Sequence, residues 1–409
     1  MTETRRLYFD DPSLLTFESR VVSVSAWQGA PAIVLEASAF YPEAGGQLGD
    51  HGVLRVGDRV IEIRDVQVDD AGVVHHLVEG AVDAALSGRQ VQGEIDRARR
   101  TQHRALHTGQ HMLSAALIEV AKAETVSSRL GESTCTIDVD VDLGPRGIDE
   151  AKIARAEALV NDLIERDVAV RAWFPEVDEL AQLHLRRAPK VSERVRVVAV
   201  GDPGAWFDVS PCGGTHVTST AQVAWMRVTG VERYKGKARV LFSAGRRART
   251  ELVDEARVLQ GLATTFTCGL REVPNAVEKL RRELAEEQIG HGLTRERLAE
   301  TIAASAQSDR GLVALVIDGA SIDLIRAVAR RVVSASQRAI AIVGGDAGSD
   351  GRPVVIERGA DSKLDCGALM KRLVAECAGR GGGRAERAEG RLGNLERWAE
   401  AVESVRASG

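Results

Sequence analysis

Two short motifs constrain the fold of this chain more than any other feature. His107-Thr-Gly-Gln-His111 and Cys212-Gly-Gly-Thr-His216 each place two strong metal ligands four positions apart. In a helix, residues with this spacing lie on one face. The apolar residues around the first motif recur at helical intervals, at Leu106, Leu113, Leu117 and Val120. The second motif is rich in glycine and follows a strand-like run, which predicts a turn.

Together the two motifs offer three imidazoles and one thiolate, a donor set that suits a tetrahedral zinc ion. Either pair alone would be weak support, but both occur in a chain with only nine His and five Cys. The sequence therefore predicts one zinc ion per chain, bound by His107, His111, Cys212 and His216. Four protein ligands would close the coordination shell, whereas catalysis needs an open position or an expanded shell, and the residues leave that choice open.

Composition excludes several classes of protein. A length of 409 residues allows several domains, and 44% hydrophobic with 28% charged residues is ordinary for a soluble protein. Five dispersed cysteines fit a reducing compartment better than a disulfide scaffold. The N-terminus has no apolar signal segment, and no run approaches the roughly 18 apolar residues of a membrane span. We expect a cytoplasmic protein without a membrane partner.

The charge pattern is more informative than the net charge of −5, which by itself predicts weak attraction to phosphates. Four basic runs flank the two motifs, within residues 97–100, 186–196, 233–239 and 246–249. One such run is more often a solvated face than a binding patch. Four runs around one metal site favour a polyanionic ligand at that site.

Residues 1–95 read as a small β-barrel domain. β-branched or alternating runs, separated by Gly and Asp, predict strands at Val21–Ser25, Ala32–Leu35, Val53–Val56, Val60–Val68, Val73–Val78 and Gln90–Ile95. A loop with the sequence Gly45-Gly46-Gln47 falls within this domain.

Residues 96–250 alternate between helical and strand-like patterns and contain both metal motifs. After the histidine-bearing helix, we expect a strand at Thr134–Leu143, a helix at Ile148–Asp167, and strands at Val168–Phe174, Val195–Val200, Phe207–Val209 and Ala221–Thr229. A hairpin follows, with Lys235-Gly236-Lys237 at its turn. The pattern predicts an α+β domain with helices on one face of a mostly antiparallel sheet.

Residues 251–308 are highly charged and predict a helical linker. Gly290 and Gly292 interrupt its apolar stripe, which favours two helices over one. The linker is either a packed spacer or the seam of a homodimer, and the sequence leaves both open.

Residues 309–409 predict a separate α/β domain. Its expected strands are Gly311–Gly319, Ala339–Gly344 and Val354–Arg358, and its expected helices are Ser321–Ser336, Cys366–Cys377 and Arg391–Arg406. Between the last two helices we expect a Gly-rich loop from Arg380 to Arg387, whose arginines can approach phosphates. The chain as a whole is thus predicted to be a multidomain α+β protein.

Three sequence motifs, two of which contain the proposed ligands, resemble signatures of the editing domain of alanyl-tRNA synthetases. They are His107-Thr-Gly-Gln-His-Met-Leu-Ser, Cys212-Gly-Gly-Thr-His-Val, and Phe40-Tyr-Pro-Glu-Ala-Gly-Gly-Gln47. Leu7-Tyr-Phe-Asp-Asp and Phe17-Glu-Ser-Arg-Val resemble the start of the free-standing alanyl-tRNA editing proteins, the AlaX family, in its long form. The last domain resembles one shared by alanyl-tRNA synthetases and DHH-type phosphoesterases. It departs from that pattern at Ala385-Glu386 and Ala388-Glu389-Gly390, which puts a nucleic-acid role there in doubt.

The resemblance implies a zinc-dependent aminoacyl-tRNA deacylase that proofreads alanine tRNA mischarged with serine or glycine. We expect no aminoacylation, because the chain starts almost directly at the barrel and has no Walker loop or dinucleotide fingerprint. Serine adds only a hydroxyl to alanine, and a second site that demands this hydroxyl can discriminate by roughly 10⁴. Zinc needs only to anchor the substrate or water and polarise an oxygen.

The resemblance also assigns roles to single residues. Gln47 and Thr215 are expected to contact the substrate, although Thr215 is equally a turn hydroxyl. His103, one turn before His107, would orient water or bind phosphate, unless it is a plain helix-start histidine. Asp208 either supports a zinc ligand or is an ordinary strand-end residue. The predicted tRNA-binding residues are Arg233, Lys235, Lys237, Arg380 and Arg384.

Two other functions remain open at this point. One is a zinc-stabilised, non-catalytic tRNA-binding module. The other is a deacylase for another aminoacyl-tRNA, such as a threonine tRNA. The sequence also leaves open the choice between serine and glycine, the tRNA features that are read and the oligomeric state.

Overall fold

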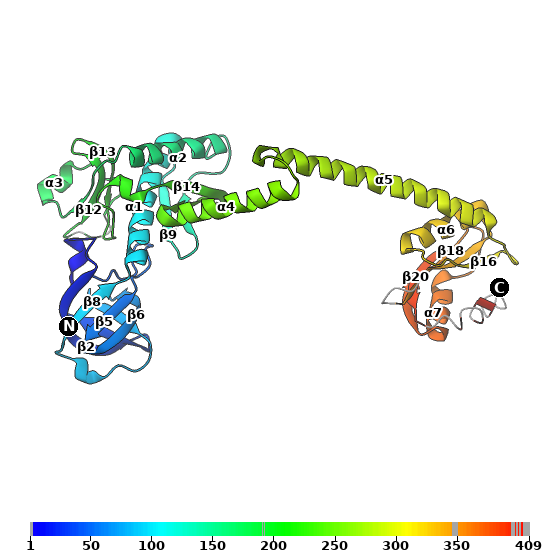
Figure 1. Cartoon of the computed structure of the whole chain (residues 1–409), viewed down its shortest axis with the longest axis horizontal. Coiled ribbons are helices and arrows are strands. Elements are labelled where there is room, and N and C mark those ends of the chain that lie inside the picture. Colours follow the sequence, from blue (N-terminus) through cyan, green and yellow to red (C-terminus); the bar gives the residue numbers. More distant parts are fainter. Residues whose placement is uncertain are drawn as a thin grey trace. The chain divides into compact units, whose positions relative to one another are not determined.

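The computed structural model describes residues 3–189, 191, 193–345, 351–393, 397, 400 and 402–403. These residues form two compact units, Met1–Gln260 and Gly261–Gly409 (Figure 1). No helix within the described ranges is long and apolar enough to cross a membrane. The finer division into domains at 1–95, 96–250, 251–308 and 309–409 stays a prediction.

The first unit begins with a closed β-barrel, as predicted. Its strands follow the order β2-β3-β7-β6-β5-β8. Their bounds are β2 (Thr16–Trp27), β3 (Ala30–Leu35), β5 (Gly52–Val56), β6 (Arg59–Val68), β7 (Val74–Val78) and β8 (Gln90–Ile95). Side chains alternate between solvent and the interior in β8, the period expected of a strand with one buried face. Short elements precede or join these strands: β1 (Arg5–Arg6), η1 (Leu7–Phe9), β4 (Ala37–Ser38) and η2 (Ala84–Leu86).

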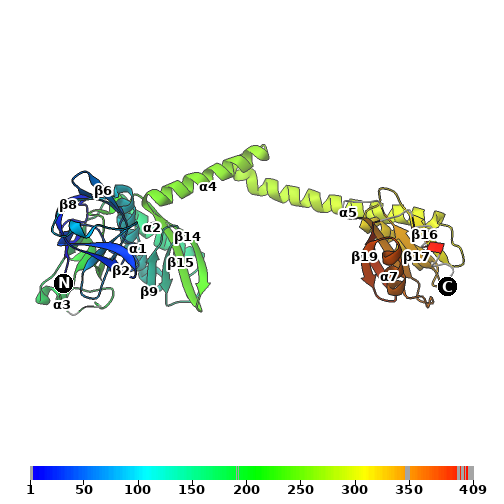
Figure 2. The ribbon, with the colours of Figure 1, turned by 90° about the horizontal axis from the view of Figure 1, so that it is seen from below.

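A four-stranded antiparallel sheet, in the order β14-β15-β10-β9, follows the barrel. Its strands are β9 (Thr125–Leu130), β10 (Cys135–Val139), β14 (Met226–Tyr234) and β15 (Lys237–Ala244). Helices α1 (Arg97–Ala121) and α2 (Glu150–Glu165) pack on one face of it (Figure 2). Asp96 and Asp149 cap the two helices by accepting backbone N–H bonds. Alternate residues of β10 point into this core, namely Cys135, Ile137 and Val139.

The remaining strands form a second sheet, which corrects the expectation of a single one. It has the order β11-β12-β13 and contains β11 (Val170–Trp173), β12 (Val197–Asp202) and β13 (Ala205–Pro211), with α3 (Val177–Gln182) nearby in sequence. β12 explains the difference because both of its faces are buried. Val198 and Val200 belong to the main core, whereas Val197 and Ala199 belong to a smaller one. Periodicity predicts such a strand but not its partners.

Part of the predicted strand Ala221–Thr229 is instead a short helix. η3 (Thr220–Val223) precedes β14, and Ala224 adopts a positive φ of 66° between them. Thr220 anchors η3 because its hydroxyl donates to the Leu163 carbonyl at 2.6 Å. This tertiary bond overrides the local strand propensity.

Two helices, α4 (Gly245–Thr265) and α5 (Val273–Ser305), occupy most of the predicted linker. The chain breaks between them around η4 (Leu270–Glu272), whereas Gly290 and Gly292 lie inside α5. A single helical glycine costs only about 1 kcal/mol, which does not end a helix of this length. α5 exposes several large apolar side chains, Leu280, Leu284, Ile289, Leu293 and Leu298. A homodimer through this helix stays a prediction.

The second unit contains a five-stranded sheet in the order β16-β17-β18-β20-β19. Its strands are β16 (Leu312–Val316), β17 (Ile340–Gly344), β18 (Arg352–Arg358), β19 (Gly379–Gly383) and β20 (Arg387–Leu392), and its helices are α6 (Ile322–Ala335) and α7 (Cys366–Glu376). β16 and β17 are parallel, and the other neighbours are antiparallel. α6 and α7 each pack into a separate core of the unit.

The predicted Gly-rich loop is instead a hairpin, because Arg380–Gly383 lie in β19 and Arg387 begins β20. Glycine is needed here for close packing: a Cβ on Gly381 would lie 2.7 Å from the Gly390 Cα and 3.0 Å from the Met370 sulfur. The predicted helix Arg391–Arg406 is wrong at its start, since Arg391 and Leu392 belong to β20. Most of its remaining length lies outside the described residues.

Candidate metal centre

Four buried side chains converge in the first unit: His107, His111, Cys212 and His216. Their ligand atoms all lie within 4.8 Å of one another. The two α1 histidines are one helical turn apart, and the other two residues lie in the loop after β13. The Cys212 Sγ is 3.5 Å from the His107 Nε2 and 3.3 Å from the His216 Nε2. The spacing of the two motifs therefore reflects one compact cluster.

Each imidazole of the cluster is held by a bond to its Nδ1 atom. The Nδ1 of His107 is 2.7 Å from the Gln47 Oε1, that of His111 is 3.0 Å from the Asp208 Oδ2, and that of His216 is 3.1 Å from the Thr108 Oγ1. The Nε2 atoms of all three rings thus remain as ligands, the arrangement that metal-binding histidines show. Three such nitrogens and a thiolate fit a metal ion, and the cluster could hold one.

The electrostatics of the cluster favour a Cys212 thiolate and neutral His107 and His216 rings. Burial raises the pKa of the Cys212 thiol, but the imidazoles of His216 and His111 outweigh it and hold that pKa well below its usual value. Burial lowers the pKa values of His107 and His216 well below the ordinary one. Burial lowers the pKa of His111, but the Cys212 thiolate and the hydrogen bond to Asp208 outweigh it and raise that pKa above its usual value. A thiolate and neutral imidazoles are the forms that bind metals.

Asp208 is a buried carboxylate behind the cluster. It accepts hydrogen bonds from the His111 ring, from the Arg186 Nε at 2.6 Å and from the Ser210 hydroxyl. Burial raises the pKa of Asp208, but the His111 hydrogen bond and the Arg186 charge outweigh burial, so the pKa is lower than usual. An ionised Asp208 can fix the His111 ring and its tautomer.

Gln47 and Thr215, the two predicted substrate contacts, lie beside the cluster and bond to each other. The fully buried Gln47 donates from Nε2 to the Thr215 Oγ1 at 2.9 Å. Its Oε1 accepts from the Thr215 N–H at 3.3 Å and lies against the His107 Nδ1. The barrel loop therefore reaches across to position both a ligand and the second motif.

Of the other predicted residues, His103 lies one helical turn before His107 in α1, and the rest lie on the β14–β15 hairpin or in the second unit. His103 is 3% exposed, burial lowers its pKa to about 4, and its Nδ1 has no partner within the described chain. Arg233 is exposed on the β14–β15 hairpin, where the Lys235 Nζ lies 5.2 Å from the Tyr234 ring centre. Lys237 pairs with Asp142 at 3.5 Å. Arg380 lies in β19 and Arg384 in the turn after it, both in the second unit.

Sequence reasoning missed three residues that hold the second motif in place. Arg196, only 5% exposed, donates from Nη1 to the Cys212 and Gly214 carbonyls at 3.0 and 2.9 Å. Arg104 donates to the His216 carbonyl at 2.7 Å, and Thr108 bonds the His216 ring. The sequence could have singled out both arginines, because each is a charged residue within an otherwise apolar, buried segment.

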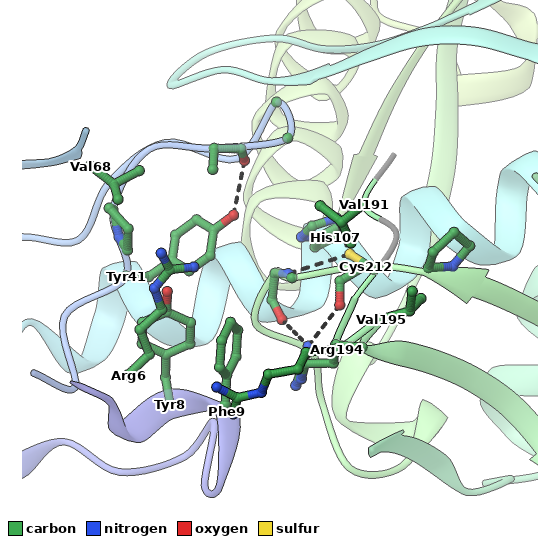
Figure 3. Close-up of a pocket in the computed structure, with 18 of the residues that line it drawn as sticks. Arg6, Tyr8, Phe9, Tyr41, Val68, His107, Val191, Arg194, Val195 and Cys212 are labelled. Carbon is green, nitrogen blue, oxygen red and sulfur yellow. Dashed lines mark hydrogen bonds between the residues drawn. The ribbon is translucent and has the colours of Figure 1, made fainter. Parts of the chain in front are cut away.

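A pocket of about 1040 Å³ opens beside the cluster. Figure 3 shows Tyr8, Phe9 and Tyr41 on one side of it and His107 and Cys212 on the other. Phe9 also contacts Phe174, with ring centres 5.5 Å apart. Arginines from the run at 186–196 stack on this aromatic wall: the Arg196 Cζ lies 5.2 Å from the Phe9 centre and the Arg194 Cζ 5.6 Å from the Phe174 centre. The pocket thus offers both aromatic and cationic surface next to the cluster.

Three known families match parts of the chain. Residues 13–99 match the family described as tRNA synthetases class II (A). Residues 195–241 match the threonyl and alanyl tRNA synthetase second additional domain, which covers Cys212 and His216. Residues 308–408 match the DHHA1 domain.

Similar proteins extend the match over nearly the whole chain. The alanine–tRNA ligase of Pyrococcus abyssi is 30% identical over 417 residues, which cover 99% of this chain and 44% of that protein. The alanyl-tRNA editing protein AlaX-L of Pyrococcus horikoshii is 27% identical over 402 residues, which cover 95% and 94%. The chain thus spans less than half the length of the ligases that it matches. The C-Ala domain of Aquifex aeolicus alanyl-tRNA synthetase aligns with 24% of this chain and 87% of its own at 19% identity, with a TM-score of 0.22.

Proposed function

The chain belongs to the AlaX family of alanyl-tRNA editing proteins, and on that premise we propose that it deacylates mischarged alanine tRNA with the help of zinc. The substrates would be alanine tRNAs that carry serine or glycine. The observation that carries the proposal is the buried four-ligand cluster at the wall of a large pocket. A volume of about 1040 Å³ is enough for an aminoacylated nucleotide, given that small-ligand pockets span roughly 300–1,000 Å³.

The reaction is the hydrolysis of an ester. Water adds to the acyl carbon, and the bond from that carbon to the ribose oxygen breaks. The ribose oxygen takes a proton and becomes a free 2′- or 3′-hydroxyl, and the amino acid is released with its carboxyl group. Zinc held by His107, His111, Cys212 and His216 would act as a Lewis acid and polarise an oxygen. The chain's own residues position the substrate and keep the ligand geometry fixed.

Positioning falls to the residues around the pocket. The aromatic wall of Phe9 and Phe174 offers a surface for the terminal base, because every base has a face that stacks on aromatic rings. Arg194, which lies over Phe174, can meet the adjoining phosphate. Arg196 fixes the carbonyls of the second motif, so the ester meets a rigid loop.

Discrimination against correctly charged tRNA requires that the pocket respond to the hydroxyl of serine. A polar group that alanine leaves unpaired would produce this response, because an unpaired buried polar group costs about 1–3 kcal/mol. We also propose that the chain does not charge tRNA with alanine. The Thr215 hydroxyl accepts from the Gln47 Nε2, which leaves its O–H able to donate to a substrate.

The test is deacylation by the purified chain, with seryl-, glycyl-, alanyl- and threonyl-tRNA offered separately. We expect seryl- or glycyl-tRNA for alanine to be hydrolysed much faster than alanyl-tRNA. Threonyl-tRNA is included because the matched family is named for both synthetases. Equal rates on the seryl and alanyl esters would overturn proofreading, faster threonyl hydrolysis would favour the threonine editor, and binding without any hydrolysis would favour the non-catalytic module. ATP and alanine are added in a parallel reaction, in which we expect no charging.

A further inference from the structure

A second pocket, of about 780 Å³, lies in the first unit away from the metal cluster. Its lining comes from the first turns of α1 and α4 and from the segment before β14. The lining residues include Arg97, Thr101, Ala105, Trp225, Arg246 and Arg249. We call it the α1–α4 pocket.

The α1–α4 pocket and the metal cluster use different faces of one helix. Arg97, Thr101 and Ala105 recur every four residues along α1 and line the pocket. His107 and His111 form a second stripe on the same helix. Ala105 and His107 are two residues apart, which places their side chains roughly 200° apart around the axis. A ligand in the α1–α4 pocket is therefore separate from one at the cluster.

The pocket carries a net positive charge, since three arginines and one carboxylate are found among its described lining residues. Arg97, Arg246 and Arg249 are exposed, and none has a hydrogen bond or ion pair to a side chain in the described ranges. Arg247, between the last two, instead donates to the Gly131 and Glu132 carbonyls, to the Ser243 hydroxyl and to the Cys135 sulfur. Asp96 is the one carboxylate of the lining, and its Oδ1 is occupied as the cap of α1.

Close packing of the two helices brings these arginines together from distant parts of the sequence. Gly245 begins α4 with a φ of +68°, and a Cβ there would lie 3.0 Å from the Ala105 Cβ. Gln102 ties the helices by donating to the Ala244 carbonyl at 2.8 Å and accepting from the Arg247 N–H at 3.0 Å. Two of the four basic runs, at 97–100 and 246–249, thereby meet in one pocket. The positive N-terminal ends of both helices border it as well.

Trp225 adds a flat aromatic surface to this charged pocket. It is half-buried, held by a bond from its backbone N–H to the Val223 carbonyl at 2.8 Å. Guanidinium groups match phosphate oxygens, and indole faces stack on unpaired bases. The combination fits a nucleotide segment of RNA better than a carboxylate metabolite, which has no use for the stacking surface.

We propose that the α1–α4 pocket is a second RNA-binding site, which holds the phosphates and one unpaired base of the tRNA whose 3′ end occupies the metal-centre pocket. The identity of the RNA rests on the proposed function, but the binding does not depend on hydrolysis. The chain carries a net charge of −5, so affinity for RNA must come from such local clusters. The site contributes affinity and orientation and takes no part in the chemistry.

The test reverses the three charges in the full-length protein, as Arg97→Glu, Arg246→Glu and Arg249→Glu together. Its control reverses Arg89, Arg146 and Arg155, which are also exposed and unpaired within the described ranges but line neither pocket. The measurements are the dissociation constant for uncharged alanine tRNA at two salt concentrations and the unfolding temperature. We expect the pocket variant to bind at least about tenfold more weakly, with a smaller salt dependence, and the control to shift by less than about threefold.

Trp225→Phe provides an independent readout. RNA should quench the tryptophan fluorescence of the wild-type protein, and this variant should lose a part of the quenching that Trp173→Phe retains. If the two triple variants weaken tRNA binding equally, the protein attracts RNA by its overall charge distribution and the proposed site is wrong. Unchanged fluorescence quenching in Trp225→Phe would also overturn the site. Single-turnover hydrolysis separates this outcome from failure of the proposed function. A wild-type protein that binds tRNA through the pocket but hydrolyses no ester would refute the function and leave the site standing.

Discussion

At the scale of single residues, the metal centre depends on groups besides the four ligands themselves. Each ring nitrogen that faces away from the centre has its own acceptor: Gln47, Asp208 or Thr108. The sequence left two roles open for Asp208, and the fold places its carboxylate against the His111 ring. Gln47 lies in the barrel loop, far along the sequence from both motifs, so no local pattern could predict its bond to His107.

The first prediction concerns Gln47. Gln47→Leu should weaken metal binding about 10–100-fold, because the His107 ring loses the acceptor that fixes its tautomer. Gln47→Glu should restore most of the affinity, since a carboxylate can accept from His107 as Asp208 does from His111. The measurement is competition with a chelator for zinc. Gln92→Leu, on an exposed position of β8, is the matched control; wild-type affinity in Gln47→Leu would contradict the positioning role.

At the scale of elements, a buried ion pair fixes the barrel to α1. Arg100 and Asp50 are both fully buried and paired, and the Tyr41 N–H also donates to Asp50, at 2.7 Å. Arg100 further donates to the carbonyls of Ala39 and Pro12. This contact holds the segment that carries Gln47 against the helix that carries His107. The ion pair therefore fixes the position of Gln47 relative to His107.

The second prediction follows from this pair. Arg100→Leu should lower the free energy of unfolding by about 3–5 kcal/mol, because it leaves the Asp50 carboxylate buried without its partner. Arg97→Leu, one turn earlier in the same helix and exposed, should change it by no more than about 0.5 kcal/mol. Chemical denaturation measures both values. A loss at Arg100 as small as at Arg97 would mean that the pair does not join the two elements.

The elements also show where sequence patterns fail. Alternation predicted the barrel strands and helical spacing predicted α1, because each has one buried face. The glycines of β19 predicted a loop, but their small size serves contact with β20 and Met370. Gly290 and Gly292 predicted a break that α5 does not have. Glycine identity alone cannot separate flexibility from close packing.

At the scale of the whole molecule, the candidate site was more predictable than the fold. The ligand types and their spacing indicated one cluster, and the structure brings the four side chains together. The sequence could not indicate that two basic runs meet at the start of α1 and α4, since that requires the tertiary contact at Gly245. It predicted tRNA contacts at Arg380 and Arg384 in the second unit, which remain to be tested.

The third prediction concerns that second unit. Arg380→Glu with Arg384→Glu should raise the tRNA concentration needed for half-maximal single-turnover hydrolysis and leave the maximal rate unchanged. Lost phosphate contacts weaken binding without touching the ester, and the effect should shrink as salt rises. Arg330→Glu with Arg338→Glu, exposed in the same unit, is the control. A reduced maximal rate at unchanged half-saturation would mean that the hairpin supports the fold or a dimer and does not bind RNA.

The most direct test of the whole account measures zinc content and seryl-tRNA hydrolysis on the same preparations of wild-type protein and Cys212→Ala. The account predicts about one zinc ion per wild-type chain, most of it lost in the variant, and hydrolysis that falls with the metal. Cys377→Ala, another buried cysteine but in the second unit, should keep both. A wild-type protein that hydrolyses seryl-tRNA without bound metal, or a Cys212→Ala variant that keeps full activity, would contradict the account.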